Sequence, residues 1–365
     1  MSDTTGMRNL HAVLAAVARV SGSLVVSMAA QSAGTSSGAA PAGWKVSRTP
    51  DGRPDLQGVW GNNSVTPMVR PTQWKDKAVL TDAELEALKQ VAARFVDQGG
   101  DAIFGNFIQM ALDARDKGTF NQLSYDPSTG NYNQFWMAER EWDNRTSLII
   151  DPADGRYPPL TPEAQARRAA GRPVPRVEGS ESGPRGPADG PEDRPLSERC
   201  ISYGAPRTQT NYNSYTQIIQ SPDTTVLLQE MIHDARVVPM VPRPHLPQNI
   251  RQLHGDPVGR WDGDSLVVET TNYINGFQGS TPNVTLTERY TRVSPDFIQW
   301  EIKVEDPATW ITPYTFMIRL KKTPGQIYEY ACHEGNYAMS GILAGARRDE
   351  ARAAAKKPRA TPGGK

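Results

Sequence analysis

The 365-residue chain has little cysteine, little histidine and no excess of charge of either sign. It contains 2 cysteines and 5 histidines, and its 40 basic and 40 acidic residues give a formal net charge of +0 at pH 7. A chain without net charge lacks the positive surface that attracts nucleic acids and anionic membranes. We therefore expect no nucleic-acid partner.

Long apolar runs and several common catalytic motifs are also missing from the sequence. No apolar run reaches the roughly 20 residues that a membrane-spanning helix needs, so we expect no integral membrane segment after leader removal. The chain lacks a G-x-S-x-G elbow, a P-loop and a G-x-G-x-x-G turn, which disfavours serine hydrolases, nucleotide enzymes and dinucleotide enzymes. H-E-x-x-H and C-x-x-C pairs are absent too, so no spacing is diagnostic of a metal site.

Residues 1–33 have the composition of a secretory signal peptide. A short basic start around Arg8 precedes a mostly apolar stretch over residues 10–30, and small residues follow. This pattern predicts a periplasmic or secreted protein, with a cytoplasmic leader as the alternative. In an oxidising compartment Cys200 and Cys332 can form a disulfide, whereas in the cytoplasm they would remain thiols. A loop of this length, 132 positions, would stabilise the fold by about 4–5 kcal/mol in the chain-entropy model.

Composition divides the rest of the chain into five stretches. The clearest helix begins at a capping Thr81 or Asp82 and carries apolar residues at helical spacing. The segment rich in proline, glycine and charge cannot bury enough apolar surface to order itself. In order, the stretches are a flexible spacer (34–43), an N-terminal part (44–160) with strands and a helical insertion (81–118), a Pro/Gly-rich loop or linker (161–199), a β-rich part (200–346) and a disordered tail (347–365).

The β-rich part contains seven short runs with strand character. In FIQWEIKVE (297–305) apolar and polar residues alternate, which predicts one buried face and one face toward water or a cavity. Short turns separate several runs, so we predict a mainly β fold, an antiparallel curved sheet or barrel of lipocalin-like shape with a small helical insertion. The runs are 214–220, 224–232, 265–273, 286–293, 297–305, 314–322 and 327–332.

Polar residues suited to acid–base chemistry gather in this β-rich part. A histidine beside a carboxylate can be held in one tautomer with a pKa near neutrality. We predict that His233 and His333 act as acid and base, that Asp234 and Glu334 orient them, and that Arg236 holds an anionic group.

Four further residues are candidates for contact with a small apolar or aromatic molecule, which would be the ligand or substrate. They are Glu230, His254, Tyr330 and Trp300. Aromatic side chains commonly line such pockets, and a few polar groups orient the ligand.

These residues indicate an exported enzyme that works without a cofactor, as a lyase, isomerase or hydrolase. One alternative is a non-catalytic, lipocalin-like ligand-binding protein. Another is a metal-dependent hydrolase, because histidines and carboxylates from several strands can bind zinc or another divalent transition metal. A strand-end cluster of this kind can also be purely structural, when its side chains only satisfy neighbouring backbone groups and charges.

Four segments of the chain resemble a group of uncharacterised exported bacterial proteins. They are TPDGRPDLQGVW, EMIHDARVVPM, HGDPVGRWDGDSLVVETTNY and YACHEGNY, and the resemblance covers most of residues 48–346. It implies export and a shared fold. It carries over no activity and no catalytic residues, so the chemistry depends on the residues themselves.

Overall fold

The computed structural model describes residues 40–96, 107–118, 139–170, 188–208 and 212–356. The predicted signal peptide and residues 34–39 of the predicted spacer lie outside these ranges. No helix in the described ranges is both long enough and apolar enough to cross a membrane.

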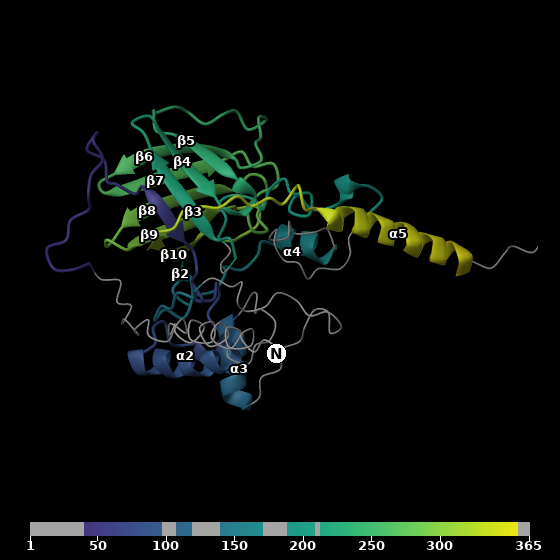
Figure 1. Ribbon diagram of the computed structural model, residues 1–365, viewed down its shortest axis with the longest axis horizontal. Helices are drawn as coiled ribbons and strands as arrows, with labels where there is room; N and C mark the ends of the chain where they lie inside the picture. The colour runs from purple at the N-terminus through teal and green to yellow at the C-terminus, as the bar shows by residue number, and fades with distance from the viewer. Residues whose placement is uncertain (1–39, 97–106, 119–138, 171–187, 209–211, 357–365) are drawn as a thin grey trace, which may run out of the picture. The chain divides into compact units, whose positions relative to one another are not determined.

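Ten strands form one antiparallel sheet, which confirms the predicted mainly β fold (Figure 1). Their order is β5-β4-β3-β1-β10-β9-β8-β7-β6, and β2 pairs with β10 beside this path. The strands are β1 Gly58–Gly61, β2 Ile149–Asp151, β3 Tyr215–Gln220, β4 Thr224–Gln229, β5 Ala235–Pro239, β6 Asp256–Asp262, β7 Ser265–Thr271, β8 Thr285–Arg292, β9 Phe297–Glu305 and β10 Tyr314–Thr323.

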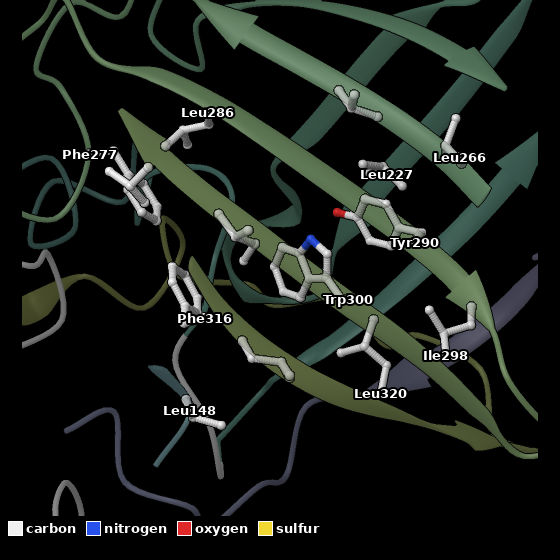
Figure 2. Close-up of a cluster of buried hydrophobic side chains, with 14 of the residues drawn as sticks. Leu148, Leu227, Leu266, Phe277, Leu286, Tyr290, Ile298, Trp300, Phe316 and Leu320 are labelled. Atoms are coloured by element: carbon white, nitrogen blue, oxygen red, sulfur yellow. The ribbon is translucent and has the colours of Figure 1, made fainter. Parts of the chain in front are cut away.

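Alternation along the central strands builds the apolar core on one face of the sheet. In the register of β9 with β10, Trp300 lies opposite Ile318 and Ile302 lies opposite Phe316, and all of these side chains are buried. Figure 2 shows Trp300 within this cluster of buried side chains on the sheet. Each such burial stabilises the fold by about 1.5–3 kcal/mol, so the core holds the frame from which the loops project.

The two ends of the sheet, β5 and β6, lie next to each other in space, and we call this junction the seam. No backbone ladder joins the two strands in the described residues, so the curved sheet is not a closed barrel. Gly259 in β6 permits the close approach, because an added Cβ would lie 2.8 Å from Val238 Cγ1 and 2.4 Å from Met240 Sδ. Side chains rather than backbone hydrogen bonds therefore connect the two ends.

Four α-helices accompany the sheet in the described ranges: α2 Asp82–Val96, α3 Phe107–Lys117, α4 Pro162–Ala169 and α5 Tyr337–Lys356. The helices α2 and α3 are those predicted within 81–118, and they share an apolar cluster that includes Leu88 and Leu112. The helix α4 opens the predicted loop 161–199, and Thr161 caps it by accepting a hydrogen bond from Ala164 N at 3.1 Å.

Two predictions for the C-terminal region were wrong. Residues 327–332 are not a strand, because β10 already pairs with β1 and β9 and offers no free edge to the chain that follows it. The tail, predicted to be disordered from residue 347, is helical to Lys356 as part of α5. Its alanine, arginine and glutamate residues are strong helix formers, and this propensity outweighs the lack of a buried face.

Candidate functional site

The disulfide Cys200–Cys332 positions the loops beside the seam, and it confirms the predicted pairing. The two Cα atoms are 5.6 Å apart although the residues are 132 positions apart in the chain. The bond joins the loop before β3 to the segment after β10. Residues 200–208, which we call the 200s loop, are therefore held at a fixed place next to the ends of β4 and β5.

The connection from β4 to β5 determines which of its side chains face inward. Ile232 and His233 both adopt left-handed backbone conformations, with φ of 56° and 46°. Such values are rare for residues other than glycine, and for a β-branched residue they mark a constrained turn. After this turn the chain extends, so Asp234 and Arg236 point to the same side, and both are buried. His233 is left exposed.

Ser202, Asp234 and His254 meet at the seam. The Ser202 hydroxyl donates to Asp234 Oδ2 at 2.8 Å and lies 3.0 Å from His254 Nε2. The same imidazole nitrogen is 3.4 Å from Asp234 Oδ1. Backbone N–H groups complete the arrangement: Tyr203 N donates to Asp234 and Gly204 N donates to Ser202 Oγ. The geometry joins a residue just before β5 to one just before β6 through the 200s loop.

Burial shifts the pKa values of Asp234 and His254 in opposite directions. It raises the pKa of the Asp234 carboxyl above 3.8, although His254 and Ser202 partly offset the effect. It lowers the pKa of the His254 imidazole below 6.5, with Asp234 opposing the shift and Arg236 adding to it. The two values therefore approach each other, and a proton passes between these groups at less cost than between the free side chains.

Arg207, at the far end of the 200s loop, is a buried charge with few partners. Its side chain is 7% exposed, and its guanidinium lies 5.0 Å from the centre of the Tyr203 ring. Nη2 donates to the carbonyl of Tyr212 at 3.1 Å, while Nε and Nη1 have no hydrogen-bond acceptor in the described part of the chain. Burial lowers the pKa of Arg207 to about 10, although Asp234 and Glu230 are near enough to oppose the shift.

Glu230, at the end of β4, is the acidic counterpart of Arg207. It is 5% exposed, and its Oε2 has no hydrogen-bond donor among the described residues. Burial raises the pKa of its carboxyl, with the backbone of Tyr328, the amide of Asn213 and the charge of Arg207 opposing the shift. We call Ser202, Arg207, Glu230, Asp234 and His254 the seam cluster.

A second polar group lies deeper on the apolar face, and there the charges are paired. Arg236 donates to both oxygens of Glu288 and to Thr270 Oγ1. Tyr290 Oη and Trp300 Nε1 donate to Glu288 Oε2 at 2.7 Å and 3.2 Å. We call these five residues the inner network.

Pairing in the inner network outweighs the cost of burial. Arg236 and Glu288 are 1% and 0% exposed. Burial opposes the charge on Arg236, but the attraction of Glu288 is larger in total and raises the pKa of the guanidinium. Arg236, predicted to hold an anionic group, thus already has a carboxylate in that place. Trp300, predicted to contact a ligand, donates to the same carboxylate.

Apart from Arg236 and Trp300, which belong to the inner network, the sequence-predicted residues divide into two sets. Glu230, Asp234 and His254 belong to the seam cluster. Tyr330 lies beside it: the centres of the Tyr330 and Tyr212 rings are 6.5 Å apart, and Tyr330 is near enough to Arg207 to affect the pKa of the guanidinium. The second set is exposed, and within the described residues its side chains make no hydrogen bond or ion pair. This set consists of His233, His333 and Glu334.

Sequence reasoning missed Ser202, Tyr203 and Arg207. These residues lie in an irregular loop without periodicity, and their only signal was their position directly after Cys200. For the metal alternative, no group of three or more histidine, cysteine, aspartate or glutamate side chains in the described part is arranged to hold an ion.

Comparison with known proteins gives little information about the function of this site. No protein-family model matches the chain, and no curated protein is significantly similar to it. One solved structure that matches is a crystal structure of a secretary abundant heat soluble protein from Ramazzottius varieornatus. The match has a TM-score of 0.22 and 14% sequence identity, and it covers 30% of this chain and 70% of that one. A likeness at this level says nothing about activity.

Proposed function

We propose that the protein is an exported enzyme that acts on a small apolar or aromatic molecule, with His254 as the general base and acid. The observation that carries the proposal is the position of the imidazole: Nε2 lies 3.0 Å from Ser202 Oγ and 3.4 Å from Asp234 Oδ1, while the side chain is 20% exposed. An imidazole that buried partners hold in place and that still reaches solvent suits proton transfer to a ligand.

The roles of the residues follow from their exposure. His254 in its neutral form takes a proton from the substrate, Asp234 stabilises the imidazolium, and His254 returns the proton to the product. This cycle serves a lyase or an isomerase, and in a hydrolase the same base would activate water. Ser202 is fully buried and its hydroxyl proton points to Asp234, so we assign it a positioning role rather than that of a nucleophile.

Export is part of the proposal. The leader composition of residues 1–33 supports it. The disulfide Cys200–Cys332 supports it as well, because disulfides persist in oxidising compartments and are rare in the cytoplasm.

A second candidate is a non-catalytic protein that binds the same kind of molecule. The observation that favours it is the pair of incompletely partnered buried groups, Arg207 and Glu230. They can recognise a ligand without any proton transfer, and His254 would then contribute only to the shape and polarity of the site.

A substrate screen with two histidine variants separates these candidates. We expect turnover of one class in a panel of aromatic esters, lactones and hydroxy acids, and a loss of about 10²–10⁴-fold in kcat/KM on His254→Gln. His233→Gln should retain the activity, since that side chain is exposed and makes no hydrogen bond or ion pair within the described residues. Circular dichroism confirms that both variants fold.

Two other results point away from the proposal. Loss of turnover on His233→Gln with normal activity on His254→Gln would contradict the assigned base. Binding of a panel member that both variants retain, without turnover by the unmodified protein, would favour the non-catalytic candidate.

A further inference from the structure

We propose that Arg207 is the anchor for the carboxylate of a small aromatic or apolar acid, which binds beside Glu230 and His254. This inference deepens the proposed function, because it names the substrate class of the same site. It rests on that function for the fate of the ligand, whereas the binding step can be measured separately.

The first support is the incomplete pairing of Arg207. A guanidinium has five N–H donors and no acceptor. Here a single backbone carbonyl, Tyr212 O, accepts from Nη2, while Nε and Nη1 have no acceptor among the described residues. Removing such a cation from water costs several kcal/mol unless an anion compensates it. A bound carboxylate would supply that compensation together with charge-assisted hydrogen bonds.

The second support is the contrast between Arg207 and Arg236. Both arginines are buried, yet the charge of Arg236 is neutralised by Glu288, which accepts from two of its nitrogens. No carboxylate in the described part of the chain lies within ion-pair distance of Arg207, although Glu230 and Asp234 lie near enough to influence its pKa. The fold therefore supplies a counterion to one buried arginine, although the Nε of Arg236 also has no hydrogen-bond partner in the described part of the chain, and it supplies no carboxylate within ion-pair distance to the other.

Charge selects a carboxylate over a phosphate. The site holds one cation, Arg207, and two carboxyl groups, Glu230 and Asp234. A singly charged carboxylate can pair with the guanidinium, whereas a phosphate ester carries close to two negative charges at pH 7 and therefore meets stronger repulsion from the two carboxyl groups. We expect phosphate esters to bind more weakly than acids of the same shape.

The aromatic side chains around Arg207 indicate which group the carboxylate of the ligand carries. The Arg207 guanidinium lies over the Tyr203 ring, and Tyr330 contacts the Tyr212 ring edge-on. Tyr203 and Tyr330 are only half-buried, so part of each ring faces outward beside the buried charge. Such rings favour an apolar or aromatic group attached to the carboxylate.

The site is also preorganised before a ligand arrives. The disulfide at Cys200 fixes the start of the 200s loop, and Ser202 and Tyr203 N both donate to Asp234. A ligand that binds to loops already held in place loses less of its binding free energy to ordering them.

Calorimetric titration of the full, disulfide-bonded chain with phenylacetate tests the inference. Phenylacetate is expected to bind, and Arg207→Met should weaken binding by about tenfold to a hundredfold, since one charge-assisted contact is lost. The matched control is Arg260→Met, which changes an exposed arginine of β6 and should leave binding within about twofold. The neutral methyl ester and phenyl phosphate should each bind at least about tenfold more weakly than phenylacetate.

A second variant covers the case in which Arg207→Met does not fold. Glu230→Gln removes a negative charge near the guanidinium and should tighten phenylacetate binding several-fold. Equal binding of the acid and its ester, unchanged binding in Arg207→Met, weaker binding in Glu230→Gln, or no binding of phenylacetate would each overturn the inference.

The titration also distinguishes this inference from the proposed function. Phenylacetate binding that His254→Gln retains and Arg207→Met loses supports the anchor even if no turnover is found. Turnover that depends on His254, combined with phenylacetate binding that is indifferent to Arg207, would preserve the proposed function and overturn the anchor.

Discussion

The seam cluster and the inner network each contain a buried arginine, but the two arginines have different surroundings. Arg236 donates to both oxygens of Glu288 and to Thr270. Arg207 has one backbone acceptor, and two of its nitrogens have none in the described part of the chain. The comparison shows that burial alone does not identify a functional charge, since a buried ion pair often serves structure only.

The directions of the pKa shifts also differ between the inner network and the seam cluster. Pairing raises the pKa of Arg236 despite burial, so that the charged form is held firmly. In the seam cluster, burial dominates and shifts Arg207, Glu230, Asp234 and His254 toward their neutral forms. In the inner network the charge of Arg236 is therefore compensated by Glu288, whereas in the seam cluster the charge of Arg207, whose pKa stays at about 10, has no carboxylate within ion-pair distance in the described part of the chain.

The largest expected effect comes from removing the disulfide that fixes the 200s loop. Cys200→Ser with Cys332→Ser should lower the free energy of unfolding by up to about 4–5 kcal/mol, because the unfolded chain regains the freedom of a 132-residue loop. Urea unfolding measures this loss.

Hydrogen exchange on the same double variant sharpens the comparison. Amide protection in the 200s loop should fall while β8 and β9 stay protected, because the inner network does not depend on the disulfide. Equal loss of protection in both regions would mean that the two regions do not unfold separately.

The next largest effect is expected from breaking the inner network. Glu288→Gln leaves the Arg236 charge buried without a counterion, and we expect a loss of about 3–5 kcal/mol in unfolding free energy. The double variant Arg236→Met with Glu288→Leu should recover most of this loss because no buried charge remains. Glu301→Gln, on the other face of β9, is the matched control. A failure of the double variant to recover stability would show that the network contributes more than charge pairing.

The smallest expected effect concerns the pKa of His254. Asp234 raises this pKa while burial lowers it, so Asp234→Asn should lower it further. Titration of the imidazole signals by NMR measures the change, and Asp264→Asn, at an exposed turn, serves as the control. An unchanged or higher pKa of His254 in Asp234→Asn would contradict the contact between the two side chains.

The lowered pKa of His254 also predicts how the stability of the protein changes with pH. Burial holds the pKa of His254 in the folded protein below its ordinary value of 6.5, so its contribution to stability is present above that value and is lost as pH falls through the folded pKa. His254→Gln should flatten this part of the stability profile.

Much of the fold could be predicted because the alternation along β9 and its neighbours directly reports a buried face. The disulfide followed from two cysteines and a leader. The strand β6 was missed because its Gly-Arg-Trp-Asp sequence resembles a turn, although Gly259 in fact permits close packing across the seam. The buried Glu288 did have a signal, since it alternates with Leu286 and Tyr290 on an otherwise apolar face.

The candidate site was less predictable because its contacts depend on how the backbone turns and on which distant segments it brings together. Two positive φ angles turn His233 outward while its neighbour Asp234 faces inward. The partner of Asp234 is His254, which reaches it across the seam. Because His233 is next to Asp234 in the sequence, we expected His233 to be its partner. No local sequence pattern indicates the contact of Asp234 with His254.

Urea unfolding of Arg207→Met beside Arg236→Met tests whether Arg207 lacks the counterion that Arg236 has, because the two substitutions are the same and only the surroundings differ. Arg236→Met leaves the Glu288 carboxylate buried without its cation, and we expect a loss of about 3–5 kcal/mol. Arg207→Met removes a buried charge that has no carboxylate within ion-pair distance in the described part of the chain, so the free energy of unfolding should stay the same or rise. Equal large losses in both variants would show that Arg207 has a counterion within the protein, as Arg236 has, and would contradict its role as an anchor for an external carboxylate.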